Sequence, residues 1–133
     1  MLKLIVLIIL GFWATPCLAL PTPTQVTAAL YQQIPDFPKG GVNQDGTQNL
    51  IRRLVTYHNF LKNRSPYSRF DWKLTVADYI GYNDPIRAEE YPGREELPVN
   101  PYLADQRLMD QLTRPEREAL ISTLLKIYRE NPG

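Results

Sequence analysis

Prolines and glycines divide the chain into short segments, and within these segments apolar residues recur at helical spacing. The clearest stripe lies in residues 46–62, where apolar residues and one histidine recur at spacings of three and four: Leu50, Ile51, Leu54, Val55, His58 and Leu61. Strand-like alternation of apolar and polar residues is not sustained anywhere in the sequence. The pattern therefore predicts an all-α protein.

Helix start signals place the remaining helices. Two of them begin with a capping box, in which a threonine precedes a first-turn proline and is followed three residues later by Gln or Glu: Thr22 with Gln25, and Thr113 with Glu116. The helices are expected over residues 22–33, 65–80 (or 68–80, since Ser65 and Ser68 are both suitable starts), 100–112 and 113–130. The fold expected is a small irregular or four-helix bundle with a short N-terminal helix.

Two proline- and glycine-rich stretches organise the chain. Residues 34–41 form a linker after the first helix, which we expect Ile34 and Phe37 to pack onto the domain. Residues 20–45 are thus an N-terminal helix with its linker, and residues 46–133 a helical domain, together one globular domain. A long Pro/Glu-rich connection, residues 81–100, interrupts that domain, and connections of this length are uncommon unless they are functional or mobile.

Residues 1–19 have the pattern of a secretory signal peptide. Lys3 precedes an unbroken apolar run over residues 4–14, and the small residues Cys17 and Ala19 stand three and one positions before the expected cut. A retained membrane anchor is the alternative, but a span needs about 20 apolar residues and Pro16 interrupts the run. The sequence therefore predicts an exported or secreted protein, associated with a membrane at most peripherally.

Loss of the signal would also remove the only cysteine, Cys17, so the mature chain would contain no disulfide and no cysteine-based metal site. Without Lys3 the basic and acidic residues are equal in number, which argues against a nucleic-acid partner. Charge is nevertheless segregated along the chain. Residues 47–73 hold six basic residues and one acid, whereas residues 74–118 hold ten acids and five basic residues. These two halves either neutralise each other as solvated salt bridges or form docking surfaces for a protein partner.

If docking surfaces exist, two sets of residues are the candidates. The acidic connection would supply one surface, in which tyrosines act as rigid anchors among carboxylates: Tyr82, Glu89, Glu90, Tyr91, Glu95 and Glu96. The basic half would supply the other: Arg52, Arg53, Arg64 and Arg69. The alternative is that the connection is a solvated loop whose tyrosines pack on their own domain.

No catalytic constellation is recognisable. His58 is the sole imidazole, and the serines lack a nucleophile-elbow context. Because His58 lies on an apolar stripe, a packed and hydrogen-bonded histidine is the first interpretation. The alternative is a small-ligand or pigment site anchored by His58 and lined by Trp72, Tyr57 or Phe60. We expect no metal, no cofactor and no enzymatic activity.

Residues 70–81, Phe-Asp-Trp-Lys-Leu-Thr-Val-Ala-Asp-Tyr-Ile-Gly, together with the secretory start, resemble small uncharacterised exported proteins of cyanobacteria. The resemblance implies the periplasm or thylakoid lumen as destination, where small helical proteins accompany membrane complexes. The function expected is therefore that of a non-enzymatic interaction protein, an accessory or assembly factor of a membrane-associated complex.

Overall fold

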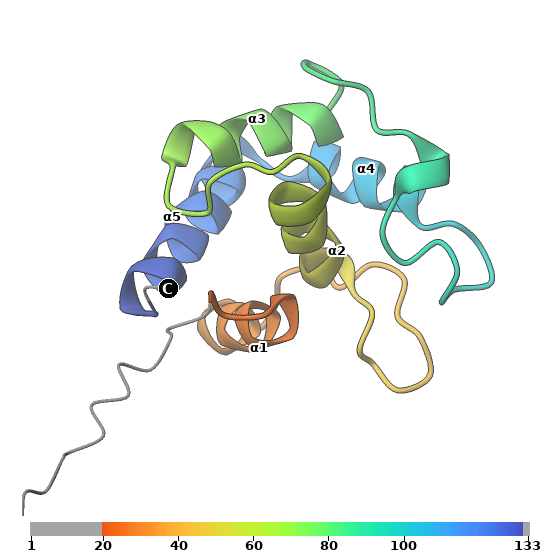
Figure 1. The fold of residues 1–133 in the computed structure, drawn as a ribbon, viewed down its shortest axis with the longest axis horizontal. Helices are drawn as coiled ribbons and strands as arrows, with labels where there is room; N and C mark the ends of the chain where they lie inside the picture. The colour runs from red at the N-terminus through yellow and green to blue at the C-terminus, as the bar shows by residue number, and fades with distance from the viewer. Residues whose placement is uncertain (1–19, 132–133) are drawn as a thin grey trace, which may run out of the picture.

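The computed structural model describes residues 20–131, and these residues form helices without any strand, which confirms the all-α prediction. Figure 1 shows the arrangement of the helices. The elements are α1 (Pro23–Gln33), α2 (Leu50–Thr56), the π-helical turn η1 (Tyr57–Leu61), α3 (Arg69–Tyr79), the 3-10 turn η2 (Ala88–Glu90), α4 (Tyr102–Gln111) and α5 (Arg114–Glu130). The predicted signal peptide lies outside the described residues.

The core forms where α5 meets its neighbours. Helix α5 contacts α1 and α3, α1 also contacts α2, and α3 also contacts α4 (Figure 1). The buried side chains come from every α-helix and include most of the stripe predicted in residues 46–62, with Leu50, Ile51, Leu54, Val55 and His58 at 0% exposure. Leu61, the last member of that stripe, is 37% exposed, so its predicted burial was wrong. Phe37 is buried and Ile34 is partly buried against the core, as expected for the linker.

Local capping explains where the helices begin. Both predicted capping boxes are formed: the Thr22 side chain accepts from the Gln25 amide at 3.2 Å, and the Thr113 side chain accepts from the Glu116 amide at 3.3 Å. Helix α3 starts after Ser68, whose side chain accepts from the Asp71 amide at 3.1 Å. Of the two serines considered for this start, Ser68 is therefore the cap.

The prediction of one helix over residues 46–62 was wrong in two respects. Helix α2 begins only at Leu50, because Asn49 caps it by accepting from the Arg52 amide at 3.0 Å. From Tyr57 onward the turn widens, and the Lys62 amide donates to the Tyr57 carbonyl, a five-residue step, at 3.0 Å. Such π-helical turns are rare and often lie next to functional sites.

The two oppositely charged halves of the chain fold onto each other. Each of four ion pairs joins a basic residue of 47–73 to an acid of 74–118: Arg53–Asp105, Lys62–Asp84, Arg64–Asp78 and Arg69–Glu118. This pairing favours the interpretation of mutual neutralisation. The expectation that all such pairs are solvated was wrong, because Asp78 and Asp105 are both buried.

Candidate functional site: the anchored acidic segment beside α2

Tyr91 anchors the acidic connection from within. Its side chain has 0% exposure, and its hydroxyl donates to Asp105 Oδ2 at 2.5 Å and contacts the Tyr79 hydroxyl at 2.8 Å. Because the single Tyr91 hydroxyl hydrogen is donated to Asp105, the Tyr79 hydroxyl must be the donor in its hydrogen bond with Tyr91. The prediction that Tyr91 is a partner contact is thereby corrected: its ring lies in the core, as the alternative of tyrosines packing on their own domain requires.

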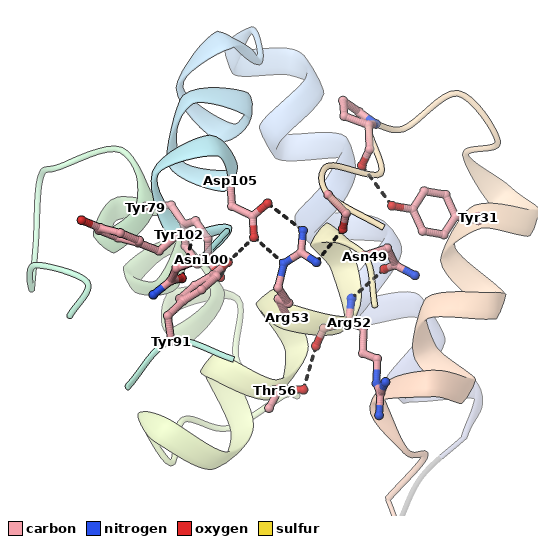
Figure 2. Close-up of polar contacts among 12 residues, drawn as sticks. Tyr31, Asn49, Arg52, Arg53, Thr56, Tyr79, Tyr91, Asn100, Tyr102 and Asp105 are labelled. Carbon is pink, nitrogen blue, oxygen red and sulfur yellow. Dashed lines mark hydrogen bonds and ion pairs between the residues drawn. The ribbon is translucent and has the colours of Figure 1, made fainter. Parts of the chain in front are cut away.

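Arg53 completes this buried network, and Figure 2 shows its guanidinium pointing toward Asp105. Its Nε and Nη2 atoms donate to the two oxygens of Asp105 at 2.6 and 2.8 Å, a bidentate pair. Its Nη1 donates to the Gly41 carbonyl at 2.8 Å. Arg53 has 0% exposure, so the prediction that it belongs to a surface patch is corrected as well. A buried guanidinium must be paired, and Asp105 pairs it.

Gly93 allows the acidic connection of residues 81–100, from here on called the acidic segment, to lie directly on Arg53. A Cβ atom at Gly93 would stand 2.9 Å from Arg53 Cδ and 3.1 Å from Gln48 Oε1, and the backbone there has φ +82°, a conformation that favours glycine. Farther along, the Asn100 side-chain amide donates to the Ala88 carbonyl at 2.8 Å. The acidic segment therefore lies against α2 at Gly93, and the Asn100–Ala88 hydrogen bond ties the segment to itself.

Two adjoining depressions lie between the acidic segment and the α2–η1 helix. The first, of about 350 Å³, is lined by Tyr57, Leu61, Lys62, Asp84, Pro85, Arg87 and Glu90. The second, of about 310 Å³, is lined by Gln48, Arg52, Thr56, Leu61, Glu90, Pro92, Gly93, Arg94, Glu95 and Glu96. Leu61 and Glu90 line both, so the two depressions adjoin. Together they are here called the acidic groove, after the acidic segment that forms one of its walls.

The acidic groove brings together residues of both predicted contact sets. Arg52 lies across from Glu90, Glu95 and Glu96, although these residues are far apart in the sequence. The guanidinium of Arg52 donates to the Thr47 carbonyl at 3.1 Å. Arg94 lies 3.6 Å from Glu95. Charges of both signs thus line the groove, and several of them already have partners within the chain.

The other predicted contact residues do not line the acidic groove. Tyr82 is 82% exposed and lies near the start of the connection, and Glu89 is exposed without lining either depression. Arg69 lies on α3, 3.4 Å from Glu118 of α5. The predicted set is therefore distributed over several faces of the molecule.

Sequence reasoning missed Gln48, which lines the acidic groove. The residue is only 7% exposed, and its buried Oε1 atom has no hydrogen-bond partner among the described residues. A buried amide oxygen without a partner costs free energy. No sequence signal could have identified it, because glutamine at this position is indistinguishable from an ordinary polar residue before a helix.

Arg64 is also an internal residue rather than a surface contact, since its side chain is 12% exposed. Its Nη1 donates to Asp78 Oδ2 at 2.6 Å and to Thr75 Oγ1 at 3.0 Å. Asp78 also accepts from the Tyr57 hydroxyl at 2.8 Å. The expectation that Arg64 is available to a partner is corrected, because these buried acceptors hold its guanidinium.

His58 is enclosed by its own chain. Its Nε2 contacts the Ser65 carbonyl at 3.0 Å, so Nε2 must carry the proton, and its Nδ1 accepts from the Thr75 hydroxyl at 2.6 Å. The ring stacks on Trp72 with 3.5 Å between centroids. His58 lines neither depression, and Phe60, a predicted wall of a ligand site, is 63% exposed. This geometry favours the packed histidine over a ligand anchor.

Burial is the main cause that lowers the pKa of His58 to about 4. The hydrogen bond to the Ser65 carbonyl raises the pKa in part, and the nearby Arg64 charge lowers it further. Since an unfolded histidine has a pKa near 6.5, the unfolded chain binds the extra proton between these values. Stability from the neutral ring is complete above pH 6.5 and is lost as the pH falls toward 4. We expect this loss to reach about 3 kcal/mol in the free energy of unfolding.

Urea unfolding of the wild type and of His58→Gln at several pH values between 7 and 4 measures this effect. The difference between the two stability curves isolates His58 from the carboxylates, which titrate in both proteins. If the two proteins differed in their free energy of unfolding by the same amount at every pH in this range, a buried, neutral His58 would be contradicted.

Within residues 20–131, no three His, Cys, Asp or Glu side chains lie in a group that could hold a metal ion. None of the helices in that range is long and apolar enough to span a bilayer. The chain matches no protein-family model, no curated protein and no solved structure. Function must therefore be inferred from the residues of the chain itself.

Proposed function

We propose that the chain is an exported, non-enzymatic interaction protein, an accessory or assembly factor of a membrane-associated complex, and that a protein partner docks on the acidic groove. One observation carries the proposal: the acidic segment is fixed from inside by Tyr91 and presents Glu90, Glu95 and Glu96 in the same depression as Arg52.

Fixing this segment favours binding energetically. A mobile loop loses conformational entropy when it binds, whereas a segment already held in place loses less. Leu61, 37% exposed, lies where the two depressions join and offers an apolar contact among charged residues. An apolar contact surrounded by charges of both signs is typical of surfaces that recognise a protein and set its orientation.

Export and location rest on the sequence. The apolar run that begins after Lys3 and the small residues at Cys17 and Ala19 support secretion. The resemblance of residues 70–81 to exported cyanobacterial proteins supports the periplasm or thylakoid lumen as the place where the partner is met.

Native gel migration after gentle membrane solubilisation tests the proposal in the native host. We expect the wild-type chain to migrate with a large assembly and the double variant Glu95→Gln, Glu96→Gln to shift largely to the free form, because it removes two exposed carboxylates of the groove. A matched double variant elsewhere, Asp110→Asn with Glu130→Gln, removes the same charge from α4 and α5 and should stay in the assembly.

The same gels can also contradict the proposal. Migration of the wild type alone, or equal retention of both double variants in the assembly, would reject the acidic groove as the docking surface. Intact mass measured on the same sample checks the predicted cut after Ala19, which is independent of docking.

A further inference from the structure

A separate groove lies between α3 and α5, away from the acidic groove. It has a volume of about 180 Å³, an apolar floor and a charged rim, and is lined by Lys73, Val76, Ala77, Ile80, Arg114, Arg117, Glu118 and Ile121. Lys73 stands on α3 and the two arginines on α5, so cations flank the floor on both sides. We call it the basic groove.

The cations of the basic groove are not neutralised within the described part of the chain. There, the side chains of Lys73 and Arg114 form neither a hydrogen bond nor an ion pair, and the Arg117 guanidinium donates to the Leu112 carbonyl at 2.7 Å, which is not an ionic partner. The only acid on the rim, Glu118, already lies 3.4 Å from Arg69. Three positive charges thus face one carboxylate that a fourth cation shares.

We propose that the basic groove binds an acidic peptide segment of a partner protein, with one apolar side chain on the floor and carboxylates against Lys73, Arg114 and Arg117. This site is additional to the acidic groove and does not depend on the function proposed for it. Charge complementarity selects an anionic occupant, and cations on both rims select one with acids on both sides of its apolar group.

The volume of the basic groove fits a single peptide side chain better than a small-molecule ligand. Small-molecule sites usually enclose about 300–1,000 Å³, whereas this groove provides about 180 Å³. That space is suited to a single side chain presented by a larger molecule. Apolar residues that project from a partner into a groove between helices, with charged neighbours on the rim, are a common mode of peptide recognition.

Fluorescence anisotropy with the complete mature protein tests the proposal. The probe is a labelled peptide with one leucine between two glutamates on each side. The variant Lys73→Gln, Arg114→Gln removes two cations that have no partner inside the described structure, so it should fold normally. We expect its dissociation constant for the probe to be at least tenfold higher than that of the wild type, and added salt to weaken wild-type binding.

Matched controls make the result specific. The variant Lys126→Gln, Arg129→Gln removes the same charge from the other end of α5 and should bind the probe as the wild type does. Probes with lysine replacing glutamate, or with glycine replacing leucine, should bind at least tenfold more weakly. Equal binding by both double variants would overturn the proposal, as would a probe that does not bind at millimolar concentration.

Binding to vesicles that contain phosphatidylglycerol tests the competing explanation, a lipid surface as the partner of the basic groove. If the wild type binds these vesicles, the Lys73, Arg114 variant does not, and the peptide probe fails, the groove recognises a lipid surface and the peptide proposal is overturned. None of these substitutions changes Glu95 or Glu96. A negative result for the basic groove can therefore be distinguished from a negative result for docking on the acidic groove.

Discussion

Replacing Asp105 by alanine should lower the free energy of unfolding by about 3–5 kcal/mol, because the change leaves the Arg53 guanidinium buried without a counter-charge. Both side chains have 0% exposure and are joined by two hydrogen bonds. The Tyr91 hydroxyl would lose its acceptor at the same time. Urea unfolding followed by far-UV circular dichroism at pH 7 measures the loss.

Two variants serve as controls for this prediction. Asp110→Ala changes an exposed acid on the same helix and should alter stability by no more than about 0.5 kcal/mol. The double variant Arg53→Met, Asp105→Leu removes both charges and should lose less stability than Asp105→Ala, although Tyr91 and Gly41 keep unsatisfied groups. A loss below about 1 kcal/mol in Asp105→Ala would show that Arg53 is not buried against it in solution.

The Asp105 variant also tests the anchoring of the acidic groove. With its acceptor removed, Tyr91 no longer ties the acidic segment to α4, and hydrogen exchange of backbone amides in residues 84–96 should accelerate more than that of α5. This outcome would connect the buried network to the surface on which the partner is proposed to dock.

Replacing Trp72 by alanine should cost about 3–5 kcal/mol of stability through loss of apolar burial and formation of a cavity. Trp72 has 0% exposure, stacks on His58 at 3.5 Å between centroids, and donates from Nε1 to the Pro66 carbonyl at 2.9 Å. The side chain therefore joins α3, η1 and the turn between them. Chemical unfolding followed by circular dichroism is the appropriate measurement, since the alanine variant loses Trp72 itself as a fluorescent probe of the core.

Trp72→Phe separates packing from hydrogen bonding. Phenylalanine keeps an aromatic face for His58 but leaves the Pro66 carbonyl without its donor, so we expect a loss well below that of alanine. If Trp72→Ala unfolded at nearly the same urea concentration as the wild type, Trp72 would not be the centre of this part of the core. The exposed neighbour Phe70, 67% exposed, supplies a matched position at which alanine should have little effect.

Local signals in the sequence predicted much of the helical structure. A threonine cap depends only on residues within one turn, and so the starts after Thr22 and Thr113 could be predicted from four residues each. The burial of the stripe from Leu50 to His58 likewise follows from spacing alone. The π-helical turn at Tyr57–Leu61 could not be predicted in this way, because the apolar spacing does not distinguish it from a regular α-helical turn.

The candidate site was predictable only in part. Arg52 and Arg53 are neighbours of the same type, yet Arg52 lines the acidic groove and Arg53 lies in the core. Tyr82 and Tyr91 belong to one connection, yet one is 82% exposed and the other fully buried. In both cases the decisive partner is Asp105, which is distant in sequence from Arg53 and appears in the sequence as one acid among many.

The sequence by itself determined the helical class, the capped helix starts, and the opposite charges of residues 47–73 and 74–118, because these depend on composition and on contacts within a few residues. Only the tertiary structure decided which charges are buried and which remain at the surface. Burial depends on whether a distant partner can satisfy a charged group once water is removed, and that is settled only when the helices pack.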